Sequence, residues 1–456
     1  MCRYLGWRMS TVISAILFAL LAAAWAFSAD SRKLADTTQD SAVDLDQLLQ
    51  QRHYLELESA LKSKSNLSAA DRSFFLGVMA NRRNRVAESI GTLEPLLPSL
   101  SVSNKERAII ALSTLADDYE KAFRYSDAAD AYAQLEIRFG SSMDENDRRK
   151  ARTEAARWNL LRGAPAQSIE VTRPFTVPII RDRVGLPEVA VDFGQLHQSL
   201  ILDTGANLSA ISLSLAQRLG LKLSRSVATS RGIAGPRMAV HTAVIPELTI
   251  GEAKLKNVAV IVIDDKNLVI PGLHYRIPGS IGFPVLSALG KITFFADGRL
   301  GVDSRPAAAS PGGKNLFLQR LTLIAPAAIG GTEHLFVIDT GSQGSFFTSQ
   351  YYFEHRNDFA SQTVGEVDLA GAGGVRTYSA YSTDKLNIKM GGACVQVNEI
   401  PVITETRGVP DDKFYGNIGQ RILGEFKSYT FDFQNMSFSA EGESCQPAEA
   451  RNSLHP

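Results

Sequence analysis

The stretch Leu200-Ile201-Leu202-Asp203-Thr204-Gly205 recurs, with different apolar residues, as Phe336-Val337-Ile338-Asp339-Thr340-Gly341. In both copies an apolar run leads into Asp-Thr-Gly, as in a buried strand that ends in a turn. A given three-residue string with glycine arises by chance in a chain of this length roughly one time in ten, so one copy alone would indicate an ordinary loop. Two copies in matching surroundings indicate a duplicated unit.

The similarity of the two copies extends through the residues that follow them. Ile281-Gly282 comes after the first Asp-Thr-Gly at nearly the same distance as Ile418-Gly419 after the second. Farther on, Ile292-Thr293-Phe294-Phe295 corresponds to Tyr429-Thr430-Phe431-Asp432. A self-similar period this long indicates two homologous lobes in one chain, and two copies are too few for a solenoid.

Two aspartates suit the hydrolysis of a peptide bond by an activated water. Two carboxyl groups close together cannot both ionise, so they share one proton: the charged group acts as general base on the water, and the neutral group donates to the scissile carbonyl. Glycine after Asp-Thr lets the two loops approach closely, since no Cβ holds them apart. The threonine hydroxyl can reach the opposite loop and hold both carboxyls in register.

These motifs resemble those of the pepsin/retropepsin class of aspartic proteases, with two retropepsin-like lobes fused in one polypeptide. The resemblance covers roughly residues 173 to 440 and implies a mostly β, bilobal pepsin-like fold. It implies that Asp203 and Asp339 are the catalytic pair. It also implies supporting roles in the catalytic loops for Thr204, Gly205, Thr340, Gly341 and Ser342, and packing behind the loops for Ile281, Gly282, Ile418 and Gly419.

The same resemblance implies a flap hairpin over the cleft in each lobe. The flap tips correspond to Gly232, Ile233, Ala234 and Gly235 in lobe 1, and to Gly371, Gly373 and Gly374 in lobe 2. The first tip lacks the tyrosine that pepsins carry there, and the second is rich in glycine, which favours mobility or an atypical shape. Phosphate-binding loops are also glycine-rich, but no Lys-Ser or Lys-Thr follows this run, so a flap or turn is the better interpretation.

The composition of the 456-residue chain argues against several other classes of protein. Lys plus Arg and Asp plus Glu are both 48, so no net field favours nucleic acid or an anionic membrane surface. The seven histidines include no His-Glu-x-x-His pair, the three cysteines have no zinc-ligand spacing, and no Gly-x-Ser-x-Gly elbow occurs. We therefore expect no metal, no cofactor and no nucleic-acid partner.

The first 29 residues have the pattern of an export signal, with Arg3 and Arg8 near an apolar core from Thr11 to Phe27. The core is also long enough for an uncleaved membrane anchor, the one membrane contact that we expect, and the sequence leaves both open. Either way, the rest of the chain should be extracytoplasmic, and we expect the periplasm. In an oxidising compartment Cys394 and Cys445 could form a disulfide; two free thiols are the alternative.

Residues 42–168 have helical spacing, which predicts a separate α-helical domain before the lobes. Its small and large residues follow the pattern of a tetratricopeptide-like repeat at Leu112, Leu115, Ala116, Tyr119, Ala128, Tyr132 and Leu135. An ordinary helical bundle and a peptide-binding solenoid both fit this pattern. We then expect lobe 1 at 173–303, a linker at 304–314, lobe 2 at 315–440 and a loose tail at 441–456.

The sequence thus predicts a multidomain protein whose bilobal part is an aspartic endopeptidase. An Asp203/Asp339 dyad would activate the water that hydrolyses a peptide or protein substrate, and the catalytic unit should be monomeric because both aspartates lie on one chain. The competing hypothesis is a non-catalytic peptide-binding or scaffold protein, in which the helical domain binds a protein partner and the protease-like part is an inactive platform. Both Asp-Thr-Gly copies are intact, which favours the enzyme.

Overall fold

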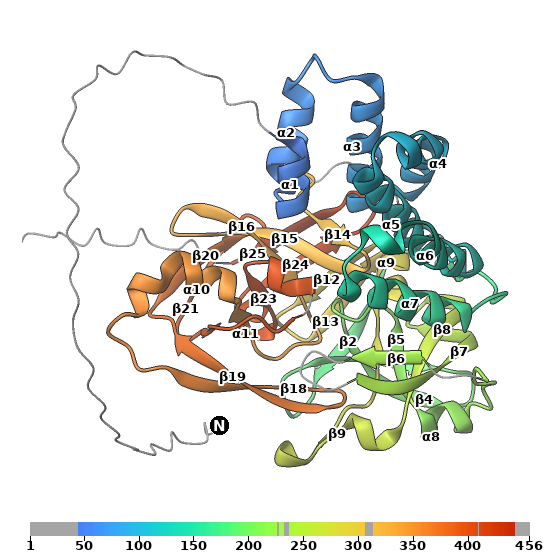
Figure 1. Ribbon diagram of the computed structural model, residues 1–456. Coiled ribbons are helices and arrows are strands. Elements are labelled where there is room, and N and C mark those ends of the chain that lie inside the picture. The colour runs from blue at the N-terminus through green and yellow to red at the C-terminus, as the bar shows by residue number, and fades with distance from the viewer. Residues whose placement is uncertain (1–43, 226–227, 232–236, 306–312, 409, 443–456) are drawn as a thin grey trace, which may run out of the picture. The chain divides into compact units, whose positions relative to one another are not determined.

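The computed structural model describes residues 44–225, 228–231, 237–305, 313–408 and 410–442. Within these residues a helical region is followed by a mostly β region, as predicted (Figure 1). The long helices are α1 (Leu45–Gln51), α2 (Tyr54–Ser63), α3 (Ala69–Arg82), α4 (Val86–Ser103), α5 (Lys105–Lys121), α6 (Tyr125–Phe139) and α7 (Glu145–Asn159). The predicted signal or anchor at 1–29 lies outside the described residues.

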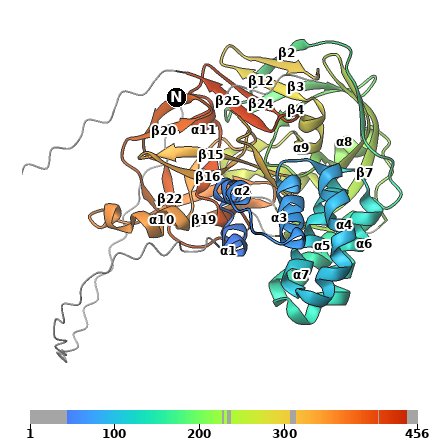
Figure 2. The ribbon, with the colours of Figure 1, turned by 90° about the horizontal axis from the view of Figure 1, so that it is seen from above.

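The helices pack in chain order, each against the next, and lie together to one side of the strands (Figure 2). Ser68, Asn104 and Asp144 cap α3, α5 and α7, because each side chain accepts an N–H from the first turn of its helix. Leu115 of α5 and Leu135 of α6, two residues of the predicted repeat, are buried. Their apolar faces therefore form the core of the helical region.

The first strand-rich half begins soon after the last helix. Its elements are β1 (Ser168–Glu170), β2 (Phe175–Arg181), β3 (Pro187–Asp192), β4 (His197–Leu202), β5 (Ser209–Ser212), α8 (Leu213–Arg218), β6 (Ala228–Arg231), β7 (Arg237–Ile250), β8 (Ala253–Ile263), β9 (Val269–Ile270), β10 (Tyr275–Arg276), β11 (Ser280–Ile281), α9 (Phe283–Ala288), β12 (Lys291–Phe295) and β13 (Arg299–Asp303). The strands β6-β7-β8-β5-β11-β4-β3-β2-β13-β12 are hydrogen-bonded in that order, and β1 pairs with β8.

The second half repeats much of this arrangement. Its elements are β14 (Phe317–Gln319), β15 (Thr322–Ile329), β16 (Thr332–Ile338), β17 (Phe346–Phe347), α10 (Ser349–His355), β18 (Gly365–Gly371), β19 (Gly374–Ser382), β20 (Leu386–Met390), β21 (Ala393–Val397), β22 (Pro401–Ile403), β23 (Gly416–Ile418), α11 (Gln420–Leu423), β24 (Ser428–Asp432) and β25 (Ser437–Glu441). Its own sheet has the order β18-β19-β22-β17-β23-β16-β15-β20-β21, with β14 against β15.

The two halves share a sheet where β12 pairs antiparallel with β24. Thr293 faces Thr430 in this pairing, and their hydroxyl oxygens are 2.9 Å apart. These are the two threonines that correspond in the duplicated sequence. Equivalent residues meet each other in this way only at an axis of approximate two-fold symmetry.

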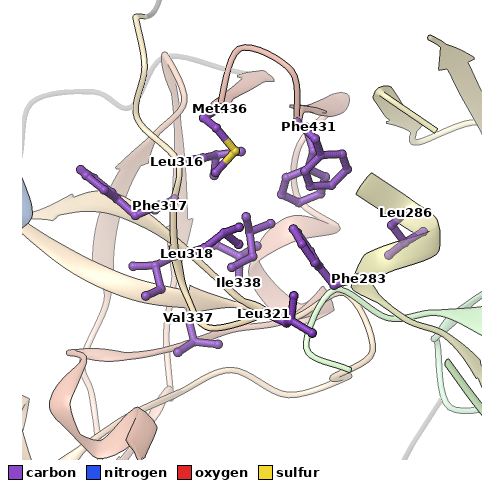
Figure 3. Close-up of a cluster of buried hydrophobic side chains, with 14 of the residues drawn as sticks. Phe283, Leu286, Leu316, Phe317, Leu318, Leu321, Val337, Ile338, Phe431 and Met436 are labelled. Atoms are coloured by element: carbon purple, nitrogen blue, oxygen red, sulfur yellow. The ribbon is translucent and has the colours of Figure 1, made fainter. Parts of the chain in front are cut away.

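A buried apolar cluster lies behind this junction and joins both halves (Figure 3). It includes Phe283 and Leu286 of α9 from the first half, and Leu321 and Ile338 from the second, all at most 2% exposed. Each such side chain stabilises the fold by about 1.5–3 kcal/mol when it is fully removed from water. The cluster therefore fixes the backs of the two Asp-Thr-Gly turns against each other.

The helices end at Asn159 and the strands begin at Ser168, near the boundary predicted between the helical domain and lobe 1. Residues 306–312 of the predicted linker and 443–456 of the predicted tail lie outside the described residues. In the part of the chain that the structure describes, no helix is both long and apolar enough to cross a membrane.

Candidate active site

Asp203 and Asp339 each follow the last residue of a strand that is paired in parallel with a short second strand. β4 pairs with β11, and β16 pairs with β23. The amide of Asp203 donates to the carbonyl of Ile281, and the amide of Asp339 donates to that of Ile418, both over 3.0 Å. Ile281 and Ile418 thus hold the two turns in the same way.

Hydrogen bonds of the threonines join the two Asp-Thr-Gly turns, and both threonines are fully buried. The amide of Thr204 donates to the hydroxyl of Thr340 and the amide of Thr340 donates to that of Thr204, both at 3.0 Å. Each hydroxyl in turn donates across the junction, Thr204 to the carbonyl of Ile338 (2.8 Å) and Thr340 to that of Leu202 (2.7 Å). These four hydrogen bonds join the two Asp-Thr-Gly turns to each other.

Each carboxyl group lies directly over the glycine of the opposite turn. A Cβ placed on Gly205 would be 2.6 Å from the carboxyl carbon of Asp339, and one placed on Gly341 would be 2.3 Å from that of Asp203. Both distances are too short for any side chain at either glycine. The amides of Gly205 and Gly341 each donate to the aspartate of their own turn at 3.0 Å. The structure therefore brings the two carboxyl groups to one point between the halves.

A second pair of glycines packs behind the turns. A Cβ on Gly282 would meet the carbonyl carbon of Leu208 at 2.5 Å, and one on Gly419 would meet the carbonyl oxygen of Gly344 at 2.2 Å. The amides of these two glycines donate to the hydroxyls of Ser209 (3.0 Å) and Ser345 (2.9 Å). Sequence reasoning missed both serines, although each lies six residues after its aspartate and aligning the two copies would have found them.

Burial raises the pKa of Asp203 to about 6, while the amides of Gly205 and Ala206, the Ser280 side chain and the Asp339 carboxyl partly oppose this rise. Both aspartates are nevertheless only half-buried, so one side of the pair stays accessible. A carboxyl group with a pKa near neutrality can carry or accept a proton at mildly acidic pH. Ser280, the residue before Ile281, is a further participant that the sequence motifs did not reveal.

The serine after the second Asp-Thr-Gly acts differently from our expectation. We expected the hydroxyl of Ser342 to support its neighbouring carboxyl group, but it donates to the carbonyl of Gly344 at 2.9 Å. Gln420 supports the second turn instead, since its amide nitrogen donates to the carbonyl of Thr340 at 2.8 Å. The side-chain oxygen of Gln420 accepts from Arg181 of the first half at 2.7 Å. The equivalent position in the first half is Phe283, so the two halves differ here.

Both predicted flaps fall on antiparallel hairpins. In the first half β6 pairs with β7 up to Arg231 and Arg237, and the predicted tip, with Gly232 to Gly235, lies outside the described residues. In the second half Gly371 pairs with Gly374, with Gly373 in the two-residue turn between them. The amide of Gly373 donates to the carbonyl of Asn267 in the first half at 2.8 Å. This tip therefore reaches across from one half to the other.

Two further expectations concern cysteines and metals. Cys394 of β21 is disulfide-bonded, while its predicted partner Cys445 lies outside the described residues. No group of three or more His, Cys, Asp or Glu side chains among the described residues is arranged to hold a metal ion. That finding leaves the prediction of a metal-independent enzyme untested.

A family model for aspartyl proteases matches residues 188–285. No curated protein matches the chain. The matched segment contains the first Asp-Thr-Gly and Ile281-Gly282, while the second copy lies beyond it. The match thus supports aspartyl protease activity in general, and it does not include Asp339.

Proposed function

We propose that the chain is an aspartic endopeptidase in which Asp203 and Asp339 act as one dyad on a water molecule. The observation that carries this proposal is the reciprocal approach of the two turns, in which each carboxyl group lies against the glycine of the other turn. Buried carboxylate pairs are costly to keep and cluster at functional sites. The family match in the first half points to the same chemistry.

In the proposed mechanism the dyad holds a single proton. The ionised carboxyl takes a proton from the water as it attacks the scissile carbonyl, and the neutral one donates its proton to the carbonyl oxygen. The raised pKa of Asp203 supports this sharing, because it keeps one carboxyl neutral at mildly acidic pH. The reciprocal hydrogen bonds of Thr204 and Thr340 hold the two carboxyl groups at a fixed separation through both steps.

We extend the proposal to the architecture around the dyad. The two strand-rich halves are lobes of a bilobal pepsin-like fold, and their approximate two-fold axis at Thr293 and Thr430 supports this. Both aspartates come from one chain, so the catalytic unit is a monomer. The N-terminal pattern favours an extracytoplasmic, periplasmic enzyme that acts on peptides or proteins there.

The test is a peptide-library cleavage assay across pH with the full chain beside Asp203→Asn and Asp339→Asn. Either amide ends the proton sharing, so each single variant should lose at least about 10³-fold in kcat, and the double variant should be little worse than either. Asp297→Asn, at an exposed carboxyl in the turn between β12 and β13, is the matched control and should cleave like the wild type. Near-wild-type kcat in a correctly folded Asp339→Asn would refute the assignment.

A further inference from the structure

The tight turn between β14 and β15 consists of Arg320 and Leu321, since Gln319 pairs with Thr322 on either side. Arg320 has φ of +58°, in the left-handed region that residues with a Cβ seldom adopt. A residue persists there when contacts around it hold it in place. In this turn Arg320 forms ion pairs with residues of the helical region. Leu321 belongs to the buried apolar cluster, which also contains Ile281 and Ile418, the residues that hold the two Asp-Thr-Gly turns.

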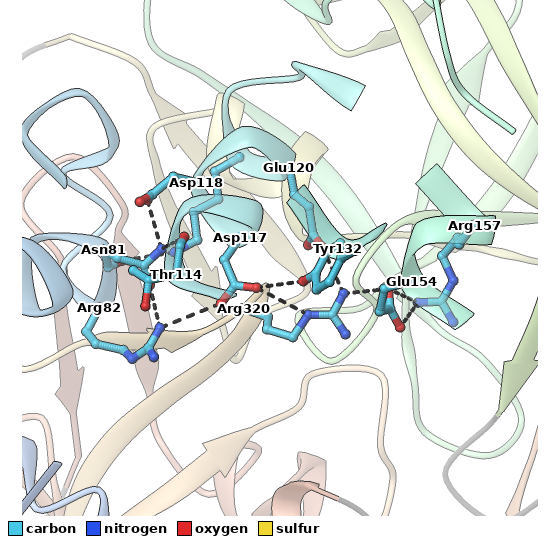
Figure 4. A network of polar contacts seen from close by, with 11 residues as sticks. Asn81, Arg82, Thr114, Asp117, Asp118, Glu120, Tyr132, Glu154, Arg157 and Arg320 are labelled. Carbon is cyan, nitrogen blue, oxygen red and sulfur yellow. Dashed lines mark hydrogen bonds and ion pairs between the residues drawn. The ribbon is translucent and has the colours of Figure 1, made fainter. Parts of the chain in front are cut away.

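The guanidinium of Arg320 enters a pocket of carboxylates on the helical region (Figure 4). Its Nη2 lies 2.9 Å from Glu120 of α5 and 2.7 Å from Glu154 of α7, and its Nε lies 3.6 Å from Asp117. The side chain of Glu120 is fully buried. A buried carboxylate needs a cation with good geometry, and the planar guanidinium can serve two carboxylates at once. Burial raises the pKa of Glu120 to about 7 and the charge of Arg320 opposes the rise.

The helical region also holds the strand that leads into this turn. Arg83, the residue directly after α3, donates to the carbonyl of Leu316 at 2.7 Å, and its guanidinium lies 3.6 Å from the ring centroid of Phe317. Tyr54 of α2 packs against the same ring and donates to Gln319. The helices thus bind the segment 316–321 of their own chain, which includes strand β14 and the turn after it. An outside peptide would have to use another face or displace this segment.

The same turn is connected to both aspartates. β15 pairs with β16 from Ile324–Val337 to Ile329–Thr332, and β16 ends at the residue before Asp339. Leu321 and Phe283 of α9 belong to the same buried apolar cluster (Figure 3), and α9 begins directly after Gly282. A displacement of this turn would therefore reach both catalytic turns through well-packed contacts.

We propose that Arg320 is a positioning residue for the Asp203/Asp339 dyad, and that the helical region is a brace which holds both catalytic turns through it. The inference rests on the proposed function. The helical region is then an integral part of the catalytic unit. The contact that holds it in place is the pairing of the Arg320 guanidinium with Glu120 and Glu154.

The experiment compares full-chain Arg320→Gln, Arg320→Lys and Arg173→Gln. Arg173 is the matched control, because its exposed guanidinium pairs at 2.8 Å with Glu252, in the turn between β7 and β8. Two readouts are used: kcat and KM per folded molecule on a cleaved peptide, and hydrogen exchange of the segments 200–210 and 336–346 without substrate. Glu154→Gln removes only one of the partners of Arg320 and serves if Arg320→Gln does not fold.

Arg320→Gln should lower kcat by about 10- to 100-fold, as expected for a dyad displaced by about 1 Å, with KM changed less than about threefold. Exchange in both catalytic turns should become faster. Arg320→Lys keeps the charge but not the planar fork, so it should recover only part of kcat, while Arg173→Gln should match the wild type. Glu154→Gln should show the same changes as Arg320→Gln, but smaller.

If hydrogen exchange in both turns and kcat per folded molecule are unchanged in Arg320→Gln, the proposal that the helical region braces the dyad is wrong. Arg320 then has a structural role only. The exchange readout needs no substrate, so it decides the question even if the wild type cleaves nothing. A wild type that cleaves nothing would count against the proposed endopeptidase, whereas faster exchange in Arg320→Gln would still support the brace.

Discussion

At the scale of single residues, the two halves are alike in the backbone and differ in the side chains around the dyad. Ser280 precedes Ile281 in the first half, and Asn417 occupies the same place before Ile418 in the second. The Ser280 side chain hydrogen-bonds Asp203 and lowers the pKa that burial has raised. A hydroxyl that donates to a carboxylate favours its charged form. Ser280 should therefore help to set the pH at which the proposed dyad holds one proton.

Ser280→Ala should move the acid limb of the kcat/KM profile to higher pH. Loss of the hydroxyl makes the ionised dyad less favourable, so the apparent pKa values of the dyad rise by about 0.5–1 unit. The measurement is a pH series of kcat/KM on one peptide. Ser342→Ala is the control, because that hydroxyl donates to Gly344 and its loss should leave the limb in place. If the acid limb of the kcat/KM profile stays in place or moves to lower pH in Ser280→Ala, Ser280 does not lower the apparent pKa values of the dyad.

Much of the residue-level site could be predicted, because the chemistry of a shared proton fixes which residues are needed. Both aspartates, both threonines and the four glycines follow from the duplicated pattern and its resemblance. Ser280 and Gln420 could not be predicted, since one isolated polar residue carries no pattern of its own. The Ser342 hydroxyl donates to the backbone carbonyl of Gly344, a contact that depends on the shape of the turn and that the residue type alone does not predict.

At the scale of elements, the β18–β19 hairpin is a further link between the halves, in addition to the β12–β24 pairing. Its turn residue Gly373 has φ of +92° and donates its amide to Asn267 of the first half. Neighbouring Ala372 packs against a buried cluster that includes Met238 and Leu268 of the first half. Hairpins at both flap positions were expected from the resemblance to aspartic proteases. The docking of one tip on the other half depends on tertiary contacts that no local pattern encodes.

Gly373→Ala should raise KM on the order of 3- to 10-fold, because a hairpin tip forced away from Asn267 covers bound peptide less well. The matched control is Gly331→Ala. Gly331 has φ of +90° in the two-residue turn between β15 and β16, and a Cβ there would meet nothing within 4 Å. Both substitutions place alanine at positive φ and should lose similar stability, roughly 1–2 kcal/mol. Equal KM values in the two variants would show that the tip does not serve the cleft.

The helical region shows the same limit of sequence reasoning. Its helices follow from apolar spacing, and residues such as Leu115 and Leu135 are buried as that spacing requires. Its partner could not be foreseen, because the acidic pocket is split between α5 and α7 and its cation comes from the second half. Charged residues that lie far apart in the sequence and come together only in the folded chain produce no periodic pattern in the sequence.

At the scale of the whole molecule, the dyad is a source of instability at neutral pH. Burial raises the pKa of Asp203 to about 6 from an ordinary 3.8, so the folded state binds this proton more tightly than the unfolded state does. The contribution of the protonated carboxyl is fully present below about pH 4 and is lost as the pH rises through about 6. Above that range the ionised Asp203 at the junction of the halves opposes folding.

Asp203→Asn should therefore make the protein more stable than the wild type at pH 7.5 and leave it equally stable at pH 4. An amide carries no charge, so the variant avoids about 1–3 kcal/mol of destabilisation at the higher pH, which corresponds to a melting temperature higher by about 2–5 °C. Thermal unfolding of both proteins at the two pH values measures this difference. Asp297→Asn should behave in the opposite way, because Arg299 lowers the pKa of Asp297 and stabilises its charged form. Equal melting temperatures for Asp203→Asn and the wild type at pH 7.5 would mean that burial of the ionised Asp203 does not destabilise the fold. The raised pKa of Asp203 would then no longer support proton sharing between the two carboxyl groups.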